Sequence, residues 1–146
     1  MKRTYECIAR RMGVMVLQAL FVVTVAAQTD YDMRYTVAFD TLGHYLKVQL
    51  DYQQNSQVNE LVLNMPRWTP GYYEMLNFPK HLCDFVAEDV QGKPLSWKKD
   101  GMNRWRISLP VDGKAHVSYR VYANQRDVAS SRVEGNLAFV APAGVF

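Results

Sequence analysis

Apolar residues recur at every second position along several short segments of this chain. Between residues 44 and 52, one set contains His44, Leu46, Val48, Leu50 and Tyr52, and the set between them contains Tyr45, Lys47, Gln49 and Asp51. A strand places alternate side chains on opposite faces, whereas a helix would mix the two sets. The alternation therefore predicts a β-strand with one apolar face.

The same period of two is present in other segments of the chain. The alternating sets are Tyr35, Val37 and Phe39; Leu61, Leu63 and Met65; Trp105, Ile107 and Leu109; and Val117, Tyr119 and Val121. Thr41-Leu42-Gly43 predicts a hairpin between the first set and the strand at 44–52. Asp112-Gly113 is a strong hairpin turn signal before the last set. A final short strand is expected over residues 137–140.

Residues 73–85 interrupt this pattern. Their apolar positions would suit a short helix, but Pro79 falls within it and removes a backbone donor. We therefore expect a loop with one helical turn, followed by a strand from about residue 82 to residue 90. The complete pattern predicts an all-β fold, an antiparallel β-sandwich of about seven or eight short strands.

The first 27 residues have the order of a secretory signal peptide. Lys2, Arg3, Arg10 and Arg11 precede an apolar run over residues 14–25, and Ala26-Ala27 then leads into a polar stretch. We expect a signal peptide at 1–27, a β-sandwich domain at 28–146, and a periplasmic or extracellular location. The alternative is an uncleaved anchor, and only in that case is the membrane a partner.

The charge of the chain gives no support for nucleic-acid binding. The whole chain has 17 basic and 14 acidic residues, of which residues 1–27 contain four and one. The remaining 119 residues therefore have 13 of each sign. Because the excess of positive charge belongs to the signal peptide, nucleic acid is not expected as a partner.

Cysteine and histidine residues do not form a recognisable catalytic or metal-binding pattern. Cys83 is the one cysteine after residue 27, so we interpret it as a small buried apolar residue; a nucleophile would need a partner base. His44, His81 and His116 lie far apart, without the i, i+4 spacing of a zinc peptidase helix. We therefore assign no catalytic residue and no metal ligand in this chain.

The segment from residue 66 to residue 74 concentrates prolines and aromatic residues. Its residues are Pro66, Arg67, Trp68, Thr69, Pro70, Gly71, Tyr72, Tyr73 and Glu74. Pro70-Gly71 favours a type II turn, because proline fixes φ and glycine accepts a positive φ. One interpretation is a rigid corner whose aromatic side chains plug the end of the sandwich. The other is an aromatic shelf that contacts a ligand or a neighbouring domain.

The stretch Met65 to Tyr73, with the pattern Met-Pro-x-Trp-x-Pro-Gly-x-Tyr, resembles a signature of the glycyl aminopeptidase family of zinc metallopeptidases. The similarity continues through Phe78, residues 85–89 with Gly92 and Leu95, residues 103–105 and residues 117–123. It covers about residues 33–146. The resemblance implies a β-rich N-terminal domain that precedes a thermolysin-like catalytic domain and a PDZ domain.

The resemblance also implies which parts of the enzyme this chain lacks. The family's His-Glu-x-x-His zinc motif is absent, so we expect the chain to be truncated before the catalytic domain and inactive alone, with zinc bound in the missing domain. The implied partners are the catalytic domain of the same protein and, indirectly, a peptide substrate. The candidate interdomain or substrate contacts are Pro66, Trp68, Pro70, Gly71, Tyr72, Tyr73 and Glu74. The alternative function is a free-standing exported β-sandwich that binds peptide or glycan.

Overall fold

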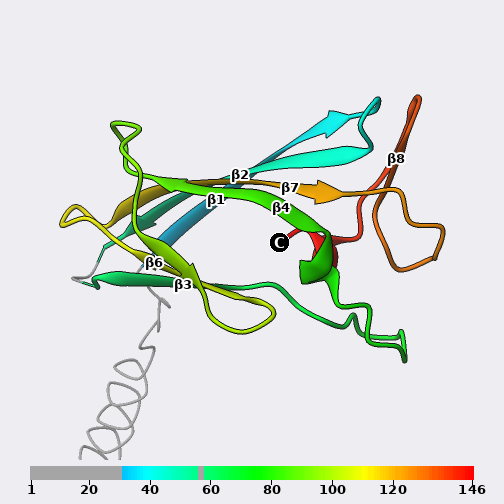
Figure 1. The fold of residues 1–146 in the computed structure, drawn as a ribbon, viewed down its shortest axis with the longest axis horizontal. Helices are drawn as coiled ribbons and strands as arrows, with labels where there is room; N and C mark the ends of the chain where they lie inside the picture. Colours follow the sequence, from blue (N-terminus) through cyan, green and yellow to red (C-terminus); the bar gives the residue numbers. More distant parts are fainter. Residues whose placement is uncertain (1–30, 56–57) are drawn as a thin grey trace, which may run out of the picture.

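The computed structural model describes residues 31–55 and 58–146, which form three antiparallel sheets (Figure 1). The larger sheet has the strand order β1-β2-β7-β4, the smaller sheet has the order β3-β6-β5, and β8 pairs with β9. The strands are β1 (Tyr31–Asp40), β2 (Tyr45–Gln54), β3 (Glu60–Asn64), β4 (Leu82–Glu88), β5 (Trp97–Lys99), β6 (Arg104–Ser108), β7 (Lys114–Tyr122), β8 (Arg132–Glu134) and β9 (Leu137–Phe139). The predicted all-β fold is confirmed, and the predicted signal peptide at 1–27 lies outside the described residues.

The first two strands form the predicted hairpin. Their register runs from Tyr31 opposite Gln54 to Asp40 opposite Tyr45. The Asp40 Oδ1 atom accepts a hydrogen bond from the Gly43 N–H at 3.0 Å, which fixes the turn. His44 was expected on the apolar face of the second strand, but it has a φ of 58° and belongs to the turn.

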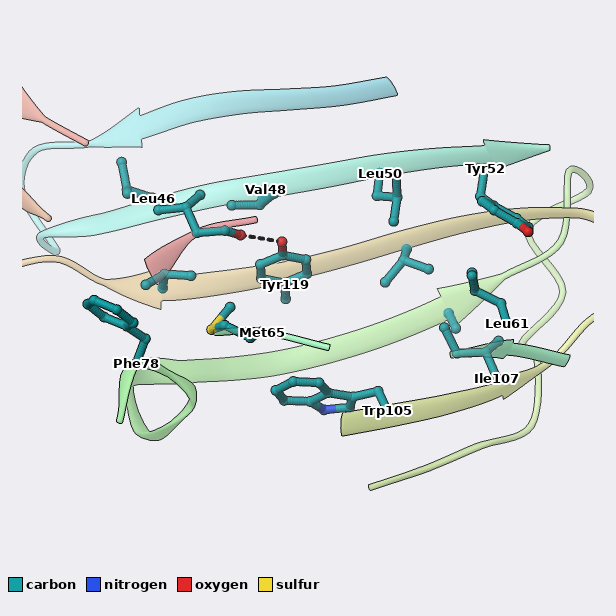
Figure 2. Packing of buried hydrophobic residues seen from close by; sticks show 14 of the residues in the cluster. Leu46, Val48, Leu50, Tyr52, Leu61, Met65, Phe78, Trp105, Ile107 and Tyr119 are labelled. Atoms are coloured by element: carbon teal, nitrogen blue, oxygen red, sulfur yellow. Dashed lines mark hydrogen bonds between the residues drawn. The ribbon is translucent and has the colours of Figure 1, made fainter. Parts of the chain in front are cut away.

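The core lies between the two larger sheets and contains the residues that the alternation selected (Figure 2). Leu46, Val48, Leu50 and Tyr52 of β2 are buried, as are Ala115, Val117, Tyr119 and Val121 of β7. The smaller sheet contributes Leu61, Trp105 and Ile107 to the same cluster. Removing such apolar surface from water contributes about 25 cal/mol per Å² to stability, so this shared face holds the sandwich together.

The predicted hairpin at Asp112-Gly113 is wrong. The strands on either side of it, β6 and β7, belong to different sheets. Gly113 has a φ of 65°, its N–H donates to the Pro110 carbonyl at 3.0 Å, and its own carbonyl accepts from the Gln54 N–H at 2.9 Å. The turn chemistry was recognised correctly, but it carries the chain from one layer of the sandwich to the other.

Residues 73–88 have the predicted loop, helical turn and strand. The 3₁₀ turn η1 covers Phe78–His81, and β4 follows at once. The register of β4 against β7 shifts between Cys83 and Val86, where Asp84 has a φ of 53°. This bulge turns the Phe85 ring inward, 5.6 Å from the Trp105 ring.

The end of the chain lies between the two sheets (Figure 1). A second 3₁₀ turn, η2, covers Pro142–Gly144, and Val145 after it is fully buried. The Tyr119 hydroxyl donates to the Val145 carbonyl at 2.5 Å (Figure 2). The Phe146 ring then contacts the Tyr35 ring edge to face, at 4.9 Å between centroids. No helix in the described part of the chain has the length and apolarity needed to cross a bilayer.

Candidate functional site

The candidate site is the loop of residues 66–74, which we call the signature loop. Met65 before it is buried, and Phe78 after it is buried in the same core cluster. The Met65 N–H donates to the Asn103 carbonyl at 3.0 Å, and the Asn103 side chain donates back to the Met65 carbonyl at 3.0 Å. Both ends of the loop are therefore anchored to the sandwich.

The tip of the signature loop is the predicted type II turn. Gly71 has a φ of 85°, and the Tyr72 N–H donates to the Thr69 carbonyl at 3.2 Å. A positive φ at the third position of the turn favours glycine, because a Cβ atom is strained there. The Trp68 indole N–H also donates to the Tyr72 carbonyl, so the tryptophan ring is fixed across the turn.

A second set of hydrogen bonds closes the base of the loop. The Asn77 N–H donates to the Arg67 carbonyl at 3.2 Å, and the Arg67 Nε–H donates to the Asn77 Oδ1 atom at 2.9 Å. Asn77 has a φ of 50°, a left-handed conformation that asparagine tolerates better than most residues. The loop is thus held at its base and at its tip.

The aromatic side chains of the signature loop face solvent. Trp68 is 44% exposed and Tyr73 is 98% exposed, while Tyr72 is half-buried and Glu74 is exposed. Tyr73 therefore does not plug the end of the sandwich, whereas Trp68 and Tyr72 are each partly covered. The loop thus presents a Trp68 ring that is held by its hydrogen bond to Tyr72, and an exposed Tyr73 ring next to Glu74 in the sequence.

A family model described as the Peptidase M61 N-terminal domain matches residues 34–146. This chain belongs to that family. The match includes the whole signature loop and every strand after β1, and it confirms the resemblance found in the sequence. The M61 N-terminal domain is thus the structural unit formed by the described sandwich.

A solved structure is also similar to this M61 N-terminal domain. It is the crystal structure of the aminopeptidase N family protein from Idiomarina loihiensis, which is 31% identical and superposes with a TM-score of 0.62. The match covers 70% of this chain and 17% of that chain, so this chain spans a small part of its relative's length. A comparison with curated proteins found no match.

The titratable residues of this M61 domain do not assemble a metal site within the described residues. There, no three His, Cys, Asp or Glu side chains lie close enough together to hold a metal ion. His44 Nδ1 lies 2.6 Å from the Val133 carbonyl, and His116 Nδ1 lies 2.6 Å from Asp51 Oδ1. Burial and the neighbouring Asp84 raise the pKa of the Cys83 thiol, which disfavours the nucleophilic thiolate.

Sequence reasoning missed an open groove of about 500 Å³ on the outer face of the larger sheet. A row of cross-strand neighbours lines it: Arg34, Asp51, His116 and Glu88. These residues come from four strands, so only the sheet register brings them together. The sequence does show the polar residues that alternate with the apolar ones in each strand. It does not show which strands are neighbours in the sheet, so the row could not be predicted.

Proposed function

We propose that this chain is the non-catalytic N-terminal domain of an exported zinc aminopeptidase-like protein, in which it packs on the catalytic domain and helps to shape the substrate cleft. The M61 family match over residues 34–146 is the observation that carries the proposal. Export is supported by the signal-peptide pattern of residues 1–27. The exposed signature loop supplies the surface that would face the substrate cleft.

The signature loop combines exposed side chains with a backbone that hydrogen bonds hold in place. Burial of an aromatic side chain against a partner is energetically favourable, and aromatic residues are frequent among the hot-spot residues of interfaces. A loop already held by hydrogen bonds loses little further conformational freedom on contact. Trp68 and Tyr73 therefore suit a cleft wall, and Glu74 beside them is a candidate partner for a peptide's free amine.

Zinc and its ligands are assigned to the remainder of the protein. The residues that the structure describes here do not fit a zinc ion, since they lack a group of three donors. When bound in the catalytic domain, zinc would polarise a peptide carbonyl and activate water. The role left to this domain is to orient and enclose the substrate.

Tyr73→Ala in the complete protein tests this function. Tyr73 is almost fully exposed, so its removal should leave folding unchanged while it weakens substrate contact. We expect the KM for an aminoacyl anilide or short peptide to rise by about 3- to 10-fold with little change in kcat, the loss of a moderate contact residue. Steady-state kinetics measure both constants.

Val111→Ala is the matched control, because Val111 is equally exposed in a loop elsewhere. It should leave KM and kcat unchanged. Unaltered kinetics in Tyr73→Ala, Trp68→Ala and Glu74→Gln together would contradict the cleft assignment. The alternative of a free-standing module, favoured by the same exposed aromatics, instead expects the 146-residue chain alone to bind a peptide or an oligosaccharide in a calorimetric titration.

A further inference from the structure

The core-facing side of β1 is only partly covered by the rest of the domain. Val37 packs against the core cluster, and Tyr35 lines a small cavity with Leu63 and Trp105 of the smaller sheet. The apolar residues of β1 lie directly opposite the buried positions of β2 and share their face: Met33 pairs with Tyr52, Tyr35 with Leu50, and Phe39 with Leu46. We call Tyr31, Met33, Tyr35 and Phe39 the β1 stripe. Phe39 is 53% exposed and Met33 is 37% exposed, whereas their partners on β2 are buried.

The stripe keeps exposed area because the smaller sheet packs on the same face of the larger sheet but closest to its β4 edge, opposite the β1 edge. Ring contacts join Phe85 of β4 to Trp97 of β5 and to Trp105 of β6. The smaller sheet thus lies against β4 and its neighbours, and β1 is the strand farthest from β4 in the sheet order (Figure 1). The core face of the sheet continues onto β1, where the second layer covers it only in part.

The outer edge of β1 is open. Within residues 31–55 and 58–146, β1 pairs with β2 alone, so one row of its backbone N–H and C=O groups has no strand partner. Proteins usually protect such an edge with lysine, proline or a bulge. Residues 31–40 contain no lysine or proline, and their register with β2 is continuous; their charged residues are Asp32, Arg34 and Asp40.

The C-terminal residues indicate what covers this surface. Val145 is fixed in the core through its hydrogen bond from Tyr119, and the Phe146 ring lies against Tyr35 in the middle of the stripe. Any polypeptide that continues from residue 146 therefore starts beside the stripe. The family is an N-terminal domain by description, and the matched region is 17% of the solved relative's chain, so much of such a protein follows it.

We propose that the β1 stripe and its open edge are the docking surface for the polypeptide that follows residue 146 in the complete protein. This inference rests on the proposed function and locates the interdomain contact within it. It separates two surfaces: the β1 stripe for the protein's own next domain and the signature loop for the substrate side. The first is a continuous apolar strand face, and the second is a short turn.

Hydroxyl-radical footprinting of the 146-residue chain and of the complete protein tests the proposal. Met33 is the reporter, since methionine oxidation follows exposure. We expect oxidation of Met33 to fall by about five-fold or more in the complete protein. Met102, which is 60% exposed in a turn of the smaller sheet, is the matched control and should be oxidised equally in both.

A pair of variants gives an independent readout. Phe39→Ser should lower the melting temperature of the complete protein by roughly 3 °C, the shift expected when an interface contact is lost. It should change the 146-residue chain little, because Phe39 is half-exposed there. Leu42→Ser, in the adjoining turn and almost fully exposed, should have no effect in either protein.

The outcomes distinguish this inference from the proposed function. Protection of other surface residues in the complete protein, with Met33 still oxidised, would overturn the β1 assignment and leave the proposed domain packing intact. If no residue gained protection, both would fail. Protection of Met33 already in the 146-residue chain would also overturn the assignment. If that protection disappeared when the protein was diluted, a second copy of the chain would be the occupant. If it disappeared when residues 1–27 were removed, those residues would be the occupant.

Discussion

Tyr119 joins the centre of the larger sheet to the C-terminal segment through one buried hydrogen bond. Tyr119→Phe removes the hydroxyl and leaves the Val145 carbonyl without its donor. We expect the free energy of unfolding to fall by about 1–2 kcal/mol, the usual effect of an unpaired buried acceptor. Urea denaturation followed by circular dichroism measures it. Tyr122→Phe, on the exposed end of the same strand, is the control and should have a smaller effect.

The same side chain predicts a response to alkaline pH. Burial raises the pKa of Tyr119 above the usual 10.0, and the pKa values of Tyr35 and Tyr52 are raised as well. Above pH 10 the unfolded chain loses these protons while the folded chain keeps them, so stability is complete below pH 10 and falls as the pH rises further. The fall should be less steep in Tyr119→Phe. If the free energy of unfolding fell equally steeply with pH in both proteins between about pH 10 and about pH 11.5, this assignment would be contradicted.

At the scale of a single element, β4 depends on its bulge at Asp84. This residue has a positive φ, and its carboxylate pairs with the Arg120 guanidinium. Asp84→Ala and Asp84→Gly both remove the ion pair but differ in backbone freedom. We expect the glycine variant to be more stable by about 1 kcal/mol, because a Cβ atom is disfavoured at positive φ. Chemical denaturation compares them, and equal midpoints would show that the bulge is unstrained.

The elements differ in how far the sequence predicted them. The alternation of Leu46, Val48 and Leu50 selected the buried face of β2 correctly, because side-chain direction follows from the strand period alone. The same rule assigned Tyr35 and Phe39 to the apolar face of β1, yet it could not indicate that the second layer covers this face only in part. Whether a strand face is covered depends on how the sheets are arranged. The turn at Asp112-Gly113 was misassigned for the same reason, because the arrangement of the sheets decides whether its two flanking strands pair.

Across the whole molecule, the two large sheets share one core and should unfold together. Ile107 of the smaller sheet is fully buried within it, whereas Val62 on the neighbouring strand is partly exposed. Ile107→Ala should lower the free energy of unfolding by about 2–5 kcal/mol, and Val62→Ala by less than about 1 kcal/mol. Tryptophan fluorescence reports Trp97 and Trp105 of the smaller sheet together with Trp68 of the signature loop, and circular dichroism reports all strands. Separate transitions by the two methods would contradict a common core.

The candidate site was predicted in part for a similar reason. The turn at Pro70-Gly71 follows from local backbone chemistry, so the sequence was sufficient for it. The direction of Trp68 was not predictable, because it depends on a hydrogen bond to the Tyr72 carbonyl that only the folded loop forms. The exposure of Tyr73 likewise depends on the conformation of the folded loop. The outer groove needed the register of four strands, which single segments do not contain.

The fixed position of Val145 also affects how two covalently joined domains meet. In the proposed complete protein, a polypeptide that continued past residue 146 would begin beside the β1 stripe, because Val145 is anchored in the core and the Phe146 ring contacts Tyr35. A domain joined at that point by a short connection would have an effective local concentration on the order of millimolar. Even a contact too weak to hold two separate proteins together would then remain closed within one polypeptide.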